Sequence, residues 1–168
     1  LLLKVDCEGK GAFEYTPDGI GIWWLAGGTG PAHYFQTLGL SLWLERRGTP
    51  CIHANAVAAG EVAIGLIAPS RTGKTTLTAA LLECGLQLMT DDMLALHCNE
   101  GRRWVYPGWP QLRMWPDSAE RFAGNDLAAL ARVHERFDKR VVEVAPGDGS
   151  RFCVHRRPLA QLFLLERR

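Results

Sequence analysis

The sequence predicts an α/β domain built on a mixed central sheet, with additional antiparallel strands at the N-terminus. Its clearest unit is the apolar run "VAIGLI" at 62–67, which is followed by the loop "APSRTGK" and by a helical stretch to Cys84. An almost wholly apolar run of this length is typical of a buried strand. Strand-like segments outnumber helical ones on both sides of this strand–loop–helix unit, which favours a mixed sheet over a purely parallel one.

The segments before the loop alternate between strand and helix patterns. Residues 1–30 alternate apolar and polar side chains and are interrupted by the turn sequences "EGKG" and "TPDG", so we expect short antiparallel strands there. A helix is predicted over "AHYFQTLGLSLWLERRG", with Gly48 as its terminator. Two strands joined by a turn near "AGE" are expected over 51–67, with His53 on the first of them.

After the loop we expect a helix over 74–84, ended by Gly85, and a strand "LQLMT" that lies beside the loop strand and ends at Asp91 and Asp92. Two further helices are predicted over "DSAERFA", with Asp117 or Ser118 as its N-cap, and over "NDLAALARVHERF". The remaining predicted strands or sheet edges are "MLALHC", "RWVYPG", "QLRMW", "KRVVEVAP", "RFCVHR" and "LAQLFLLE".

Bulk composition restricts the class of protein. The 168 residues fit one domain, 1–168, in which residues 1–30 are a candidate subdomain; the abrupt ends leave open that the chain is a fragment. A net charge of +1 argues against nucleic acid as a partner, and no apolar run reaches transmembrane length. The five scattered cysteines have no metal-ligand spacing, which favours reduced thiols and a cytoplasmic protein.

The loop has the pattern of a phosphate-binding loop, G-x-x-x-x-G-K-[ST], with Ala68 in place of the first glycine. In such a loop, backbone N–H groups and the helix dipole hold phosphates, the lysine reaches the β- and γ-phosphates, and the hydroxyl after it holds Mg²⁺. ATP and Mg²⁺ are therefore the expected cofactors, and an ordinary strand–turn–helix corner is the alternative. The expected nucleotide-binding residues are Pro69, Ser70, Arg71, Thr72, Gly73, Lys74, Thr75 and Thr76, with Arg71 facing solvent by default.

Three further features suit phosphoryl transfer, which needs one group to hold the metal and one to orient the attacking hydroxyl. The adjacent carboxylates Asp91 and Asp92 could divide these tasks, the alternative being a helix cap or an exposed turn. His53 could tune a carboxylate or contact the γ-phosphate, although a lone strand histidine is more often structural. Arg113 lies between aromatic residues and could stabilise the developing charge, or it could be an ordinary exposed arginine.

This order of residues resembles the catalytic domain of the HPr kinase/phosphorylase family over about 45 residues, from Cys51 to Leu96. The matching positions are His53, Ser70, Gly73, Lys74, Thr75, Gly85, Asp91 and Asp92. The resemblance implies a P-loop fold akin to phosphoenolpyruvate carboxykinase, ATP with Mg²⁺, and a serine hydroxyl as acceptor. It implies that Asp91 acts as the base, and that Asp92 holds the metal with Thr75 or pairs with His53.

The later stretch "YPGWPQLRMWPDSAERF" resembles a smaller branch of HPr-kinase-like proteins associated with lasso peptides, which phosphorylate a serine of the precursor peptide. Ala68, Arg71 and Thr76 depart from the bifunctional enzymes, and their phosphorylase motif is not found, so we expect a kinase without the reverse activity. A precursor peptide is the expected partner, and a homo-oligomer is left open. The alternatives are a small-molecule kinase on the same scaffold and a non-catalytic nucleotide-binding module.

Overall fold

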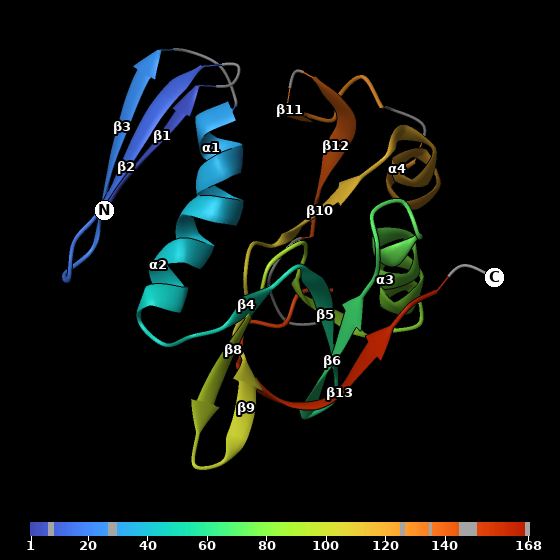
Figure 1. The fold of residues 1–168 in the computed structure, drawn as a ribbon. Helices are drawn as coiled ribbons and strands as arrows, with labels where there is room; N and C mark the ends of the chain where they lie inside the picture. The colour runs from blue at the N-terminus through green and yellow to red at the C-terminus, as the bar shows by residue number, and fades with distance from the viewer. Residues whose placement is uncertain (7–8, 27–29, 125–126, 135, 145–150, 167–168) are drawn as a thin grey trace.

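The computed structural model describes residues 1–6, 9–26, 30–124, 127–134, 136–144 and 151–166 (Figure 1). In this part of the chain the strands form three sheets, and the largest has seven strands in the order β4-β8-β9-β13-β6-β5-β7. In chain order these strands are β4 (Cys51–Ile52), β5 (Ala54–Ala59), β6 (Val62–Ile67), β7 (Gln87–Thr90), β8 (Leu94–Asn99), β9 (Arg102–Val105) and β13 (Arg157–Leu164). Only the β13–β6 pairing is parallel, so the sheet is mixed, as predicted.

The N-terminal residues form a separate antiparallel sheet of β1 (Leu2–Asp6), β2 (Lys10–Tyr15) and β3 (Ile20–Ala26), which confirms the expected strands. A continuous helical segment follows: α1 (Gly30–Tyr34), the π-helical turn η1 (Phe35–Gly39) and α2 (Leu40–Arg46). This segment lies between the N-terminal sheet and the rest of the chain (Figure 1). Gly48, the predicted terminator, has φ +80°.

The predicted strand–loop–helix unit is present. Strands β5 and β6 form a hairpin that turns at Gly60, and the loop after β6 leads into α3 (Lys74–Glu83). One face of α3 packs through Ala79 and Leu82 into the core that also buries Val57 and Leu88. Gly85 has φ +91°, a conformation that favours glycine, and it ends the helix as predicted.

The expectation that β7 lies beside β6 is wrong, because β5 lies between them and pairs antiparallel with both. β6 and β7 therefore run in the same direction and end at the same edge of the sheet. His53 lies in a bend between β4 and β5 rather than on a strand, and β5 starts at this same edge. The hairpin thus brings His53, the loop after β6 and Asp91–Asp92 after β7 to one place.

Three predictions in the second half of the chain are wrong. Helix α4 (Pro116–Ala123) starts with Trp115 as its N-cap and not with Asp117 or Ser118, since proline is well suited to the first helical position. The helix expected over residues 125–137 does not form in the described residues: turns at 127–130 lead into β11 (Arg132–His134), which pairs with β12 (Phe137–Glu143).

The apolar spacing that indicated a helix here has a different origin, because Leu127 and Leu130 pack against the main core from turns, while Val133 is buried on a strand. β10 (Gln111–Met114) completes this third sheet by pairing with β12. The expected strand "RFCVHR" is also wrong: Phe152 forms an isolated bridge to Leu88, and residues 153–156 are in no strand before β13 begins at Arg157. No helix in the described ranges combines the length and apolarity that crossing a bilayer requires.

Candidate active site

The loop after β6 ends at Gly73, which is the N-cap of α3 and has φ +98°. This left-handed conformation explains the glycine, and the residue has no side chain that could cap the helix. The first-turn residues Lys74, Thr75 and Thr76 line a small polar pocket of about 70 Å³ beside the loop. Backbone N–H groups and the positive end of the helix dipole meet at this pocket, an arrangement that favours an anion.

Lys74 is buried, and its ammonium group lies at the centre of the site. Nζ is 3.0 Å from His53 Nε2 and 3.8 Å from Asp92 Oδ1. Burial lowers the pKa of Lys74, whereas the nearby carboxylates of Asp92 and Asp91 raise it. Since Nζ donates to His53 Nε2, the ring proton is on Nδ1, which donates to the backbone oxygen of Asp92 at 2.9 Å.

Asp92 faces the pocket, and its backbone is held in an unusual conformation. Its φ is +66°, a value that costs free energy for a residue other than glycine. The Asp92 N–H donates to Asn55 Oδ1 at 3.1 Å, and Asn55 Nδ2 donates to Thr78 Oγ1 at 2.9 Å. Thr78 in turn donates to the backbone oxygen of Lys74, so the fully buried Asn55 side chain ties helix α3 to the Asp92 turn.

Asp91 lies deeper than Asp92 and, unlike Asp92, is not among the residues that line the pocket. Its Oδ2 accepts from the Arg113 backbone N–H at 2.7 Å, and its Oδ1 accepts from the Thr75 hydroxyl at 3.4 Å. Burial above all, and then the negative charge of Asp92, raise the pKa of Asp91 to about 7, against the lowering effect of Arg113 and Lys74. A cation bound beside Thr75 would stabilise the ionised form of this carboxyl group.

The oxygen atoms beside the pocket form a donor set that fits Mg²⁺. Within the described residues, no three or more His, Cys, Asp or Glu side chains come together in a group that could hold a metal ion. Mg²⁺ typically takes one or two carboxylates and fills its remaining positions with water and substrate phosphates. The hydroxyl of Thr75 with the carboxylates of Asp91 and Asp92 is such a partial set.

Arg113 is buried, not an ordinary exposed arginine. Its Nη1 lies 3.7 Å from Asp92 Oδ2, and its Nη2 donates to Gln36 Oε1 at 2.6 Å. Gln36 comes from the π-helical turn η1, a type of distortion that is frequent at functional sites. Lys74 and Arg113 thus bring two positive charges to Asp92 from different elements.

The remaining loop residues frame the pocket. Pro69, Ser70 and Arg71 line it, whereas Thr72 is not among its lining residues. Arg71 is exposed, as expected, but its guanidinium lies 5.2 Å from the centre of the Trp115 ring. Lys139 also lies over this ring, at 5.8 Å, and lines the same pocket.

Sequence reasoning missed Asn55, Gln36 and Lys139 as parts of this site. For Asn55 a signal existed, since it is a lone polar residue inside the apolar strand "ANAVAA". Gln36 and Lys139 gave no such signal, because each reaches the site from a segment distant in sequence.

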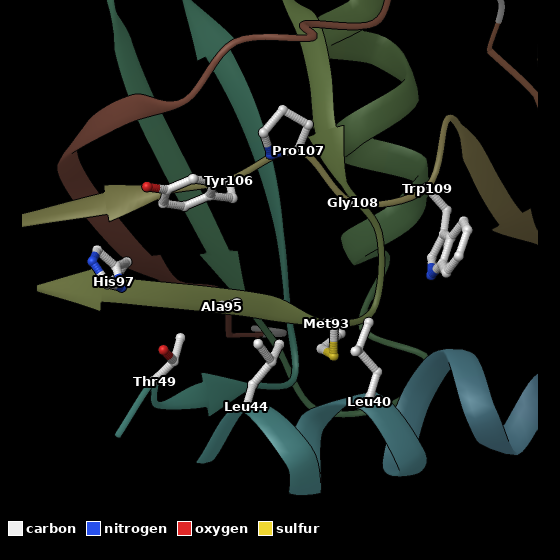
Figure 2. Close-up of a pocket in the computed structure, with 10 residues that line it drawn as sticks. All are labelled: Leu40, Leu44, Thr49, Met93, Ala95, His97, Tyr106, Pro107, Gly108 and Trp109. Atoms are coloured by element: carbon white, nitrogen blue, oxygen red, sulfur yellow. The ribbon is translucent and has the colours of Figure 1, made fainter. Parts of the chain in front are cut away.

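An apolar cavity of about 410 Å³ lies next to the site (Figure 2). Figure 2 shows Leu40 and Leu44 of α2 on one side of it, with Met93 close to Leu40, and Tyr106 and Trp109 on the opposite side. A further cavity of about 350 Å³ is lined by His53, Asp92 and Met93 together. This cavity shares His53 and Asp92 with the polar pocket and Met93 with the apolar cavity, so all three border the turn that carries Asp92 and Met93.

Comparison with family models gives no match, and no curated protein matches this chain. Among solved structures, the chain is similar to the HPr(Ser) kinase/phosphatase from Coxiella burnetii, with 16% sequence identity and a TM-score of 0.42. The similarity covers 68% of this chain and 58% of that one, so the chain spans less than two thirds of the length of the solved protein. The assignment of roles to residues therefore depends on the geometry of the site.

Proposed function

We propose that this protein is an ATP- and Mg²⁺-dependent kinase that transfers the γ-phosphate to a serine hydroxyl of a ribosomally made precursor peptide. The proposal rests mainly on one observation. The loop that ends at Gly73 and the charged side chains around it lie together at one edge of the sheet; these side chains are Lys74, Asp91, Asp92 and the buried Arg113. Phosphoryl transfer needs little more from a protein than these positioned charges.

The basic groups bind and stabilise phosphate. The N–H groups of the loop and of the first turn of α3 hold the triphosphate, together with the ammonium of Lys74. Mg²⁺ bound beside Thr75 would neutralise phosphate charge. The guanidinium of Arg113 is held close to the site by Gln36, so it can stabilise the charge that develops during transfer without reorganising.

For the two carboxylates we propose a division of roles opposite to the one that the family resemblance implies. Asp91 points at the Thr75 hydroxyl and is deeply buried, which suits support of the metal site. Asp92 lines the pocket beside Lys74, which suits accepting the proton of the attacking serine hydroxyl. His53 then orients the site through its contacts with the Lys74 ammonium and the Asp92 carbonyl.

The apolar cavity beside Asp92 supports an acceptor larger than a small polar metabolite. A peptide could place its serine at Asp92 and an apolar side chain between α2 and β8 (Figure 2). The described cysteines are free thiols, which fits the cytoplasmic setting that we also propose. A small-molecule kinase remains the second candidate, because the same cavity could take an apolar metabolite. A non-catalytic module would not need Asp92 or Arg113 in the pocket.

The test is transfer of labelled γ-phosphate to the candidate precursor peptide encoded beside the gene, with mass analysis for one added phosphate. Lys74→Ala should lose transfer and weaken ATP binding, whereas Asp92→Asn should lose transfer while ATP stays bound. Asp138→Asn is the matched control, because its carboxylate is exposed on β12. A wild-type protein that binds no Mg-ATP would refute the proposal, and wild-type transfer by Asp92→Asn would refute the role of Asp92.

A further inference from the structure

We propose that the cavity between α3 and α4 is the nucleoside subsite, and that it takes the ribose and a base with an exocyclic amino group. This proposal rests on the proposed kinase function. The cavity has a volume of about 320 Å³ and is lined by side chains along both α3 and α4. Nothing in the family resemblance assigns a role to these residues.

The cavity adjoins the phosphate pocket. Thr76, Met114 and Ser118 line both. The hydroxyl oxygens of Thr76 and Ser118 are 3.1 Å apart, so the two helices meet at the boundary between the pocket and the cavity. A ligand bound in the pocket reaches the cavity by passing over these two exposed hydroxyls, either of which can hydrogen-bond to it.

The direction of the triphosphate follows from the position of Lys74. In a loop of this kind the lysine contacts the β- and γ-phosphates, while backbone N–H groups cradle the α- and β-phosphates. The Lys74 ammonium lies on the side of the pocket that holds His53 and Asp92, so the γ-phosphate belongs there. The α-phosphate then lies toward Thr76, and the nucleoside leaves the pocket on that side.

The cavity has the surface that a nucleoside needs. Its apolar walls include Ala79 and Ala80 of α3, together with Met114 and Phe122. Small residues at 79 and 80 keep the space beside the helix open, because any longer side chain on this face would enter it. Such a combination of apolar walls and few polar groups is typical of small-molecule sites.

Polar groups stand at the rim of the cavity. Glu83 and Asp117 can accept hydrogen bonds from ribose hydroxyls or from an exocyclic amine, and Arg121 can donate. The guanidinium of Arg151 lies 5.4 Å from the centre of the Phe122 ring, so a cation also borders this side. Carboxylates favour a base that donates hydrogen bonds, and adenine does so through its amino group.

The experiment compares ATP with inorganic tripolyphosphate, both with Mg²⁺, by isothermal titration calorimetry on the full chain. The wild type should bind ATP at least about tenfold more tightly than tripolyphosphate, the gain expected from stacking one base. Ala80→Trp places a ring in the cavity from an exposed helix position and should remove this difference, leaving tripolyphosphate binding unchanged. Ala123→Trp, exposed on α4 outside the cavity, is the matched control.

Circular dichroism checks that Ala80→Trp is folded, and a second variant tests the same cavity independently. Phe122→Ala opens the same cavity instead of filling it and should also weaken ATP more than tripolyphosphate. Equal binding of ATP and tripolyphosphate by the wild type, or equal loss of both in Ala80→Trp, would overturn the nucleoside subsite while leaving the kinase proposal standing. Failure of the wild type to bind either ligand would overturn both.

Discussion

The buried amide of Asn55 offers the sharpest test of how the site is held together. Its side chain makes two hydrogen bonds, one from the Asp92 N–H and one to Thr78 Oγ1, and it is fully buried. Asn55→Ala removes both bonds, each with a net contribution of about 1 kcal/mol, and leaves the Asp92 N–H without its partner, which costs about 1–3 kcal/mol. We therefore expect the free energy of unfolding to fall by about 3–5 kcal/mol.

Asn55→Ala should also lower the rate of phosphate transfer. Without Asn55 the left-handed turn at Asp92 loses the acceptor of its N–H group, so the Asp92 carboxylate is less well placed beside Lys74. Under the proposed function, the rate of phosphate transfer should fall much more than the affinity for ATP. Urea denaturation followed by tryptophan fluorescence measures the first effect, and transfer of labelled phosphate measures the second.

The control for Asn55→Ala is Asn99→Ala, since Asn99 is exposed at the end of β8. It should change stability by less than about 0.5 kcal/mol. A loss below about 1 kcal/mol for Asn55→Ala, or an unchanged transfer rate, would show that Asn55 does not hold the Asp92 turn.

Three further outcomes can be measured with single variants. Burial and the negative charge of Asp92 raise the pKa of Asp91 to about 7. Protonated Asp91 therefore contributes to the free energy of unfolding in full below the ordinary carboxyl pKa, and this contribution is lost as the pH rises through 7. Metal-free Asp91→Asn should lack this loss in urea titrations from pH 4.5 to 8, and an identical pH dependence would contradict it. Arg113→Gln should slow transfer about a hundredfold or more with ATP binding retained, as determined from initial rates. Gly108→Ala should lower the free energy of unfolding by about 1–3 kcal/mol, because its methyl group would collide with the buried Thr90.

How far sequence patterns succeeded depended on whether the signal was local. The loop and helix α3 were predicted because they directly follow an apolar strand. The end of the helix at Gly85 was predicted because a glycine that adopts positive φ is a common local signal for a helix end. The helix over 125–137 failed for the opposite reason. Leu127 and Leu130 have helical spacing, but they pack into the core from turns, and Val133 pairs on a strand.

The sequence by itself determined which chemical groups are present: a loop with the pattern of a phosphate-binding loop, a lysine, a hydroxyl and two adjacent carboxylates at a strand end. Only the tertiary structure decided how they meet. Because β5 lies between β6 and β7, the loop and Asp91–Asp92 follow strands that end at the same edge of the sheet. Strand β10 and the turn η1 bring Arg113 and Gln36 to this edge. The physical reason is that burial and ion pairing depend on segments far apart in the chain. No local pattern therefore indicates that Asp91 is covered while Asp92 faces the pocket.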